Sequence, residues 1–368
     1  MVSTYFCRVF LRRLTLFNFK NYSEAEFSFS EGANALTGPN GSGKTNVLDA
    51  IHYLCLCKSY FGMGDRMAVR HEAGFFSISG TFSVDEGEED ILVTFRQGQK
   101  KSVKRNHREY SRLGDHIGLL PLVMEAPVDQ QIIHGSSEER RRFMDPIICQ
   151  YDHKYLDALM NYNRVLQQRN AFLKQAGHAN PDVTMREVWD EQLCALGTVI
   201  HEARRKFISS FTGIFTRYYD FLSGEKERAE ITYTSHLDQK TMQQVLGENL
   251  HKDTVMQFTT AGVHRDDLQL LMDGHPVRKL GSQGQQKCVV LALKLAQFQM
   301  IRDARGIKPI LMLDDIYDKL DAFRITRLME LVSQETFGQI FLTDTNEEHV
   351  SGIFKKLDIP LQVFPVNR

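Results

Sequence analysis

The sequence predicts an α/β fold: a sheet with a parallel core, mixed overall, carries helices on its faces, and a helical lobe is added to it. Three observations predict this class. A strand-like run at 33–37 enters a glycine-rich loop and then a helical pattern. Apolar strand runs after residue 228 alternate with helix-like segments, as in parallel sheets covered by helices. The stretch between, about 150–222, repeats its apolar residues only at helical spacing.

The N-terminal part reads as strands with one helix. Residues 25–30, "AEFSFS", alternate apolar and polar side chains, which is typical of a half-buried strand. Residues 75–84 and 91–96 predict a hairpin around the acidic turn "DEGEED". From Thr45 to about Cys57 the apolar residues recur at helical spacing. Strand, glycine loop and helix therefore follow one another directly.

The middle of the chain predicts two long amphipathic helices. One runs from about Trp189 to Tyr218 and the other from about Tyr155 to Leu173, with "GHANPD" at 177–182 between them. We expect the apolar stripes to form the core of this lobe, although a dimer seam would show the same spacing. The predicted division is a lobe at 1–145, a helical lobe at 146–250, and the remainder of the first lobe at 251–368.

The C-terminal part predicts the rest of the sheet. "ILMLDD" at 310–315 and "QIFLTDT" at 339–345 read as buried strands. Helix-like segments occupy 285–302, 323–334 and 347–356. This alternation is what predicts parallel strands with helices on both faces.

Composition narrows the class of protein. The 368 residues carry 45 Lys plus Arg against 46 Asp plus Glu, so a nucleic-acid partner would need a local basic patch. No run approaches the roughly 18 apolar residues of a membrane span, and no signal pattern opens the chain. The 6 cysteines are scattered, which is typical of free thiols in a reducing cytoplasm.

The glycine loop has the pattern of a phosphate-binding loop. Gly38-Pro39-Asn40-Gly41-Ser42-Gly43-Lys44-Thr45 fits G-x-x-x-x-G-K-[ST] at every position. Its backbone N–H groups and the following helix N-terminus attract phosphate oxygens. Lys44 would reach the β and γ phosphates of a nucleotide, and the Thr45 hydroxyl would ligate Mg²⁺.

Two acids end the strand at 310–313. A buried parallel strand would deliver Asp314 to the sheet's C-terminal edge, where α/β folds bind ligands. Asp314 is therefore the predicted carboxylate for Mg²⁺, and Asp315 is the predicted residue to orient the hydrolytic water.

Residues 280–297, "LGSQGQQKCVVLALKLAQ", resemble the signature segment of ABC-type ATPases. Ser282, Gln283, Gly284 and Gln285 fill the turn that opens its helix. Residues 314–324, "DDIYDKLDAFR", look like the Walker B acids followed by the D-loop, with Leu320 and Asp321 at its core. The resemblance implies an ATP-dependent, head-to-tail homodimer, in which each signature caps the γ phosphate of an ATP held with Mg²⁺ by the partner.

Within these ATPases the chain resembles the RecF family of bacterial recombination mediators, which are related to SMC proteins. "LTLFNFKNYSEAEFSF" at 14–29, "GSSEERRRFMD" at 135–145 and "AGVHRDDLQLLMDG" at 261–274 carry the resemblance. SMC proteins carry a coiled coil of hundreds of residues, which a chain of 368 residues with this head cannot contain. The resemblance implies a weak, DNA-stimulated ATPase that binds single-stranded and gapped DNA. It also implies RecO and RecR partners, and roles in recombinational repair and the SOS response.

The chain departs from the wider ABC pattern at several places. Asp315 stands where most ABC ATPases carry Glu, and Thr343-Asp344-Thr345 offers no histidine at the switch position. Gln130 and Gln131 both remain candidates for the Q-loop. An ATPase subunit of a membrane transporter shares the loop, signature and acids, and stays open as the alternative function. A nuclease-linked relative would need an added carboxylate site.

Two basic clusters are candidates for contact with DNA. The stretch 96–112 is rich in Lys and Arg, and its central candidates are Lys100, Lys101, Lys104 and Arg105. The other is Arg140-Arg141-Arg142, which follows Ser136, Ser137, Glu138 and Glu139. Those four residues read as a helix N-terminus, so this arginine run can equally serve packing and local ion pairs. A solvated hairpin is the alternative for the first cluster.

Overall fold

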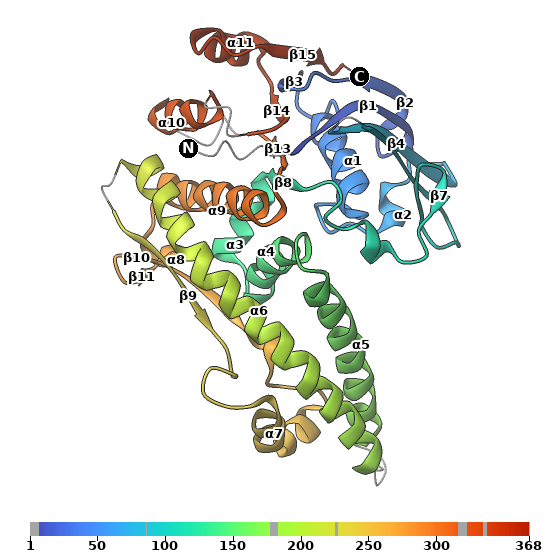
Figure 1. The fold of residues 1–368 in the computed structure, drawn as a ribbon, viewed down its shortest axis with the longest axis vertical. Coiled ribbons are helices and arrows are strands. Elements are labelled where there is room, and N and C mark those ends of the chain that lie inside the picture. The colour runs from blue at the N-terminus through green and yellow to red at the C-terminus, as the bar shows by residue number, and fades with distance from the viewer. Residues whose placement is uncertain are drawn as a thin grey trace. The chain divides into compact units, whose positions relative to one another are not determined.

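A computed structural model describes residues 7–85, 87–176, 183–224, 227–315, 322–333 and 337–367 (Figure 1). The chain forms two compact units. Unit 1 comprises 1–129, 218–226 and 282–368, and unit 2 comprises 130–217 and 227–281. Each unit is thus built from separated stretches of the chain. The predicted boundaries after 145 and 250 stay predictions.

Unit 1 contains the predicted parallel sheet. Its strand order is β15-β3-β14-β13-β8, and every neighbouring pair is parallel. The strands are β3 (Ala33–Thr37), β8 (Leu122–Glu125), β13 (Ile310–Leu313), β14 (Ile340–Asp344) and β15 (Leu361–Pro365). All residues of β3, β8, β13 and β14 are buried, as in strands covered on both faces. Their carboxyl ends share one edge, which fixes where the residues that follow them lie.

A larger and mostly antiparallel sheet completes unit 1. Its path is β12-β1-β4-β5-β6-β7, with β2 paired to β1, and only the β1–β12 pair is parallel. The strands are β1 (Cys7–Phe19), β2 (Tyr22–Ser28), β4 (Phe75–Val84), β5 (Gly87–Arg96), β6 (Ser102–Arg105), β7 (Arg108–Glu109) and β12 (Ile307–Lys308). Phe76, Ile78 and Phe82 of β4 face the core, so the predicted hairpin forms with the expected alternation.

Helix α1 (Lys44–Leu56) is buried around nearly its whole circumference. Its apolar residues share one core with side chains of both sheets, including Phe76 of β4 and Met312 of β13. Burial on all sides is typical of a helix in the interior of a protein. The other helical segments are α2 (Asp65–Ala68), α9 (Gln283–Arg305), α10 (Ala322–Ser333), α11 (Glu347–Lys356), η1 (Leu113–His116) and η2 (Pro127–Gln130).

Unit 2 holds the predicted helical lobe. Its long helices are α5 (His153–Ala176) and α6 (Val183–Ser223), of which the residues up to 217 belong to this unit. Residues 177–182, the predicted break, lie outside the described residues. The other elements are α3 (Gln131–His134), α4 (Ser137–Cys149), α7 (Met242–Met256), α8 (Val277–Leu280), η3 (Val263–Arg265), β9 (Ala229–Thr234), β10 (Asp267–Met272) and β11 (His275–Pro276). The strands form an antiparallel sheet in the order β11-β10-β9.

The apolar stripe of α6 packs inside its own chain. Leu193, Ile200, Phe207 and Phe211 are each at most 1% exposed. The stripe is therefore core of the lobe, as its spacing predicts, and not an exposed seam. Helix α6 is 41 residues long, which exceeds the predicted length because the apolar pattern continues through Tyr219 and Leu222.

Two fully buried arginines hold unit 2 together. Arg204 of α6 bonds Asp145 of α4 at 2.9 Å and Asp266 at 2.7 Å, and Arg169 of α5 bonds Asp253 of α7 at 2.8 Å. Periodicity cannot predict such pairs, because their partners are distant in sequence.

Among the described residues, no helix combines the length and the apolar character needed to cross a bilayer.

Candidate nucleotide site

The glycine loop joins β3 to α1 at the C-terminal edge of the parallel sheet. Two of its glycines are in conformations that favour glycine: φ is 143° at Gly38 and 118° at Gly43. A Cβ at Gly38 would lie 2.3 Å from the Val366 carbonyl oxygen, and one at Gly43 would lie 2.5 Å from Asn21 Nδ2. A residue other than glycine would have to move the Val366 backbone at position 38 or the Asn21 side chain at position 43.

Asn21 and Tyr22 brace the loop from the turn between β1 and β2. Asn21 Nδ2 donates to the Ser42 carbonyl at 2.9 Å, and the Tyr22 hydroxyl donates to the Gly43 carbonyl at 3.3 Å. Burial raises the pKa of Tyr22 to about 12, so its phenol remains a neutral donor. The sequence alone predicts no role in the site for either residue. The segment 14–29 that contains them carries only the family resemblance.

Two polar side chains of the loop, those of Ser42 and Lys44, are buried. Lys44 is 5% exposed, and its Nζ donates to the carbonyls of Gly38 at 2.7 Å and Pro39 at 3.0 Å. The Ser42 hydroxyl is buried and has no hydrogen-bond partner within the described part of the chain. A buried donor without a partner is costly, so a ligand with acceptor oxygens would be stabilised here.

Thr45, Asp314 and Thr343 converge from α1, the end of β13 and β14. The Thr45 hydroxyl lies 3.0 and 3.1 Å from the two Asp314 carboxylate oxygens, and the Thr343 hydroxyl donates to Asp314 at 2.8 Å. Asp314 is 2% exposed. Adjacent oxygen ligands of an octahedral Mg²⁺ at about 2.1 Å are about 3 Å apart, so the Thr45–Asp314 spacing fits that ion. The structure therefore brings together Thr45 and Asp314, the two residues predicted to bind Mg²⁺. Binding of the ion itself stays a prediction.

Asp315 turns out of the strand with a φ of 51°. Aspartate tolerates this left-handed region better than most residues, because its short polar side chain can bond locally. Its N–H donates to the Thr343 hydroxyl at 2.9 Å. One threonine therefore fixes both neighbouring acids. In the sequence alone, Thr343 stands out only as part of the switch position that lacks a histidine.

The predicted signature residues open helix α9. Ser282 is the N-cap: it accepts from the Gln285 N–H, and Gln285 returns the bond as a capping box. Gln283 is the first helical residue, and a Cβ at Gly284 would lie 3.1 Å from an Arg324 nitrogen. Ser282 is exposed. Within the described residues no hydrogen bond joins Ser282 to the glycine loop. Leu320 and Asp321, the predicted D-loop core, lie outside the described residues.

A buried polar network joins α1 and α9. Asp49 of α1 accepts from the Tyr60 N–H at 2.7 Å. The Tyr60 hydroxyl in turn lies 2.7 Å from both Asp129 Oδ2 and Lys294 Nζ of α9. Burial, and then the Asp129 carboxylate, raise the pKa of Tyr60 well above its ordinary value, so it stays protonated. This network fixes the two helices relative to one another.

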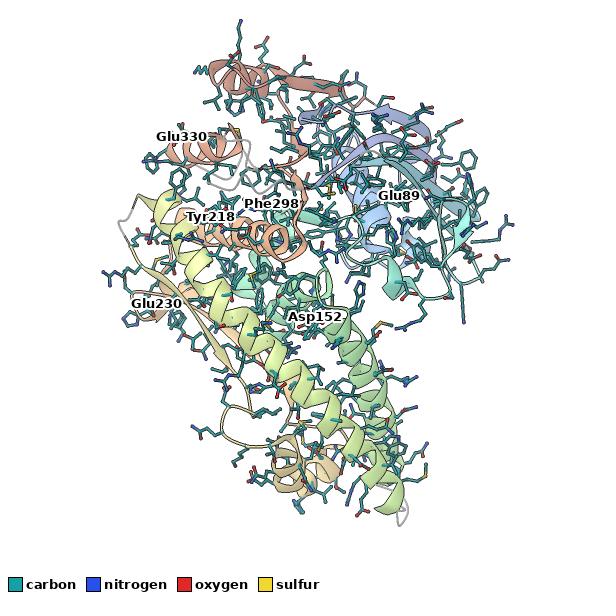
Figure 2. All side chains as sticks on the ribbon, viewed as in Figure 1. Glu89, Asp152, Tyr218, Glu230, Phe298 and Glu330 are labelled. Carbon is teal, nitrogen blue, oxygen red and sulfur yellow. The ribbon has the colours of Figure 1, made fainter. Side chains whose placement is uncertain are left out.

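The four DNA candidates differ in their surroundings. Lys101 is 11% exposed and pairs with Asp65 at 2.8 Å. Arg105 forms hydrogen bonds to Glu89 of β5, which raise the pKa of the guanidinium further. Glu89 is labelled in Figure 2. Lys100 is exposed and Lys104 is half-buried. Of these four side chains, Lys100 and Lys104 are therefore the ones most available to an external anion.

The arginine run 140–142 is engaged inside unit 2. Arg140 bonds both carboxylate oxygens of Asp267, and Arg141 donates to the Asp266 carbonyl at 2.7 Å. Arg142 pairs with Glu138 and Glu139, behind the Ser136 N-cap of α4. This favours the packing and local ion-pair interpretation of the cluster.

The fold and sequence match known proteins over nearly the whole chain. Residues 10–111 match the model of the RecF/RecN/SMC N-terminal domain. A DNA replication and repair protein RecF of Phocaeicola vulgatus is 44% identical over 97% of this chain and 96% of its own. A solved structure of "the recombination mediator protein RecF-ATPrS in RecFOR pathway" has a TM-score of 0.87 and 26% identity, covering 99% of this chain and 98% of that one.

More distant structures share the fold alone. The Smc head domain from Pyrococcus furiosus, solved with an extended coiled coil and bound to the C-terminal domain of ScpA, matches with a TM-score of 0.54 and 18% identity. This match covers 93% of this chain and 91% of that one. The predicted ABC-type ATPase head with a helical lobe is thereby confirmed. The relative from Phocaeicola vulgatus decides the family, because its 44% identity extends over 97% of this chain. The chain belongs to the RecF family of DNA replication and repair proteins.

Proposed function

We propose that this chain is an ATP- and Mg²⁺-dependent ATPase that dimerises on nucleotide and acts on DNA in recombinational repair. The observation that carries the proposal is the convergence of Thr45, Asp314 and Thr343 beside the glycine loop. Family membership and the solved RecF–ATPrS relative support ATP as the nucleotide.

The residues of the loop would bind and orient the triphosphate. Backbone N–H groups of residues 38–45 and the N-terminus of α1 would hold the phosphate oxygens. Lys44 would exchange its carbonyl partners for phosphate oxygens, and the Ser42 hydroxyl would gain the acceptor it lacks. Thr45 and Asp314 would hold Mg²⁺, which supplies charge neutralisation between the phosphates. Asp315, fixed by Thr343, would orient the attacking water.

Dimerisation would complete the site. Ser282 presents an exposed hydroxyl at the start of a 23-residue helix, which is suitable for the γ phosphate bound by a second copy. Gln283, Gly284 and Gln285 would form the rest of that signature turn, and Leu320 and Asp321 the D-loop. The resulting head-to-tail homodimer would hold two ATP molecules at its interface.

The DNA and protein partners follow from the family. We infer binding to single-stranded and gapped DNA, slow DNA-stimulated hydrolysis, RecO and RecR as partners, and a cytoplasmic role that includes the SOS response. Lys100 and Lys104 would contribute more to phosphate contacts than Lys101 and Arg105, because the latter pair with Asp65 and Glu89.

Replacing the loop lysine tests the nucleotide site. Lys44→Ala should weaken ATP binding on the order of 100-fold, since truncating one partner of a buried charged pair costs roughly 2–5 kcal/mol. Isothermal titration calorimetry with ATP and Mg²⁺ measures this. Lys356→Ala, at an exposed lysine in the last turn of α11, is the matched control and should bind as the parent does. Equal affinity of the Lys44→Ala variant would refute the nucleotide site.

A further inference from the structure

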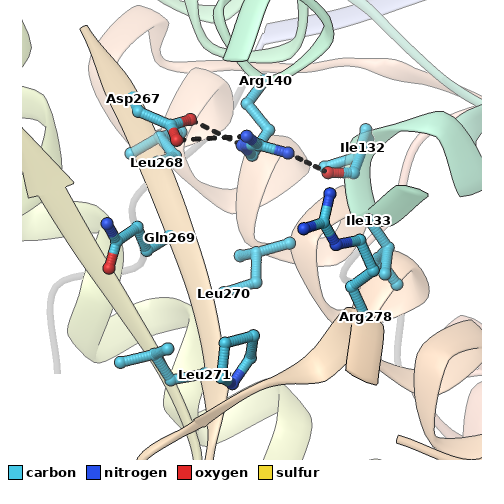
Figure 3. Close-up of a pocket in the computed structure, with 10 residues that line it drawn as sticks. Ile132, Ile133, Arg140, Asp267, Leu268, Gln269, Leu270, Leu271 and Arg278 are labelled. Carbon is cyan, nitrogen blue, oxygen red and sulfur yellow. Dashed lines mark hydrogen bonds and ion pairs between the residues drawn. The ribbon is translucent and has the colours of Figure 1, made fainter. Parts of the chain in front are cut away.

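Unit 2 contains a cavity of about 230 Å³ beside strand β10. Ile132 and Ile133 of α3 form one wall, Arg140 of α4 lies above, and Arg278 of α8 points in from the side opposite the strand (Figure 3). Residues 267–271 of β10 and Pro276 line the remainder. None of these residues belongs to the proposed nucleotide site.

The strand edge that faces the cavity can be identified from the hairpin. Asp273 and Gly274 connect β10 to β11 with φ of 49° and 78°, the values of a two-residue type I′ turn. In such a hairpin the residues flanking the turn, here Met272 and His275, exchange hydrogen bonds. Alternate residues then direct their main-chain groups the same way, so those of Leu270 and Leu268 point to the β11 side.

A hydrogen bond on the opposite edge supports this assignment. The Asp273 N–H donates to the Arg228 carbonyl at 3.0 Å, which extends the β9 ladder and places the odd-numbered residues on the β9 side. Strand β11 pairs only with Leu271 and Met272. Within the described residues, the main-chain groups of Leu268 and Leu270 therefore have no strand partner on the cavity side.

The cavity also carries a net positive charge. Arg140 is neutralised, because it bonds both oxygens of Asp267 and the carbonyls of Ile132 and Gly135 (Figure 3). Arg278 is exposed and forms no hydrogen bond or ion pair in the part of the chain that the structure describes. An open strand edge, apolar walls and one available guanidinium thus meet in one place.

We propose that this cavity binds an extended segment of a partner protein, which adds a strand to β10 and places an acidic side chain on Arg278. The segment's N–H and C=O groups would pair with those of Leu268 and Leu270, and an apolar side chain would pack on Ile133. The volume is below the roughly 300–1,000 Å³ of ordinary small-molecule sites, which favours a side-chain anchor. Nucleic acid fits less well, because phosphates accept hydrogen bonds but cannot donate to the strand's carbonyls.

The test selects a displayed library of random octapeptides against the full chain. Enriched peptides should alternate apolar residues with an acidic one, and Arg278→Glu should weaken their binding about tenfold or more. Lys279→Glu makes the same charge change at the next exposed residue, which does not line the cavity, and should bind as the parent does. Fluorescence anisotropy with the synthesised peptide measures both variants.

Two further measurements separate strand addition from general charge attraction. The bound peptide should slow hydrogen exchange at the Leu268 and Leu270 amides, while Gln269, already paired to β9, changes little. N-methylation of one peptide amide that faces β10 should abolish binding, and N-methylation of the adjacent amide should not. Absence of any enriched peptide, or equal binding by Arg278→Glu, overturns the proposal. So does a dependence on Arg278 that appears only for a single-stranded oligonucleotide.

Discussion

At the scale of single residues, Thr343 is the group on which the arrangement of the acids depends. Its hydroxyl donates to Asp314 and accepts from the Asp315 N–H, so it ties β14 to the end of β13. The residue is fully buried. Loss of its hydroxyl would leave a buried carboxylate and a backbone donor each short of a partner.

Thr343→Val should therefore separate nucleotide binding from hydrolysis. Valine keeps the shape, so we expect ATP affinity within a few-fold of the parent and a lower kcat, because Asp315 is no longer held. The expected loss is about tenfold, from a misplacement worth about 1–3 kcal/mol. Steady-state phosphate release and calorimetry measure the two quantities. Thr345→Val, at an exposed neighbour, is the control; an unchanged kcat in Thr343→Val would contradict the role of Thr343.

His52 predicts how stability responds to pH. Burial lowers the pKa of this α1 side chain from 6.5 to about 4, so the folded state favours the neutral ring and the unfolded state takes up a proton first. Its contribution to the free energy of unfolding is present above pH 6.5 and is lost as pH falls toward 4. Between pH 7 and pH 5 this amounts to about 2 kcal/mol. Urea unfolding of His52→Gln should show a weaker acid dependence than the parent, whereas His71→Gln, at an exposed histidine, should not.

The site residues that the sequence could predict are those that obey a local pattern. Residues 38–45 form a contiguous motif, and Asp314 follows an apolar run that identifies its strand. Asn21, Tyr22 and Thr343 could not be assigned in this way, because their roles are defined by partners brought close only by the fold. Thr343, for example, meets an aspartate 29 positions away.

At the scale of elements, the start of α9 has two requirements. Ser282 caps the helix through the Gln285 N–H, and the proposed dimer also needs its hydroxyl at a phosphate. Aspartate is as good an N-cap as serine, but its negative charge would repel a triphosphate. This difference allows the two roles to be separated.

Ser282→Asp should preserve the stability of the chain and prevent ATP-dependent dimerisation. The reference protein for this experiment is the Asp315→Asn variant, which is expected to hydrolyse ATP slowly. Because ATP then stays bound, light scattering should detect the ATP-dependent dimer of this variant. Adding Ser282→Asp to that background should leave a monomer that still binds ATP. Ser136→Asp, at the N-cap of α4, is the matched control and should leave the dimer intact. Dimerisation of the Ser282→Asp double variant would remove the signature from the proposed interface.

Elements with a clear period were predicted better than their ends. The helix expected over about 189–218 runs from Val183 to Ser223, because aromatic residues continue the stripe beyond Tyr218. The strand expected at 25–30 begins earlier, at Tyr22, where its pairing with Phe19 of β1 starts. Periodicity reports which face is buried, whereas the partner strand and the caps decide where an element stops.

At the scale of the whole molecule, unit 2 depends on charges that are buried in its centre. Arg204 is 2% exposed and bonds Asp145, Asp266 and the Val263 carbonyl. Removing Arg204 would leave the Asp145 and Asp266 carboxylates without this cation in a low-dielectric interior. Such a loss is strongly destabilising even where the intact pair adds little net stability.

Arg204→Met should destabilise unit 2 by roughly 3–5 kcal/mol without altering the glycine loop of unit 1. Hydrogen exchange monitored by mass spectrometry on the full chain should show faster exchange in α5, α6 and β10, and ATP affinity should stay within about twofold of the parent. Arg205→Met changes the neighbouring, exposed arginine and controls for loss of charge. Unchanged protection of α6 in Arg204→Met would show that the buried pairs are dispensable.

The strand order of the parallel sheet has a consequence for synthesis. Strand β3 leaves the ribosome early, yet its neighbours on both sides, β14 and β15, span residues 340–344 and 361–365. The nascent chain must therefore carry this apolar strand with both edges unpaired until residues 340–365 have been made. The glycine loop that follows β3 can therefore take up its final conformation only after both of these neighbouring strands have emerged and paired.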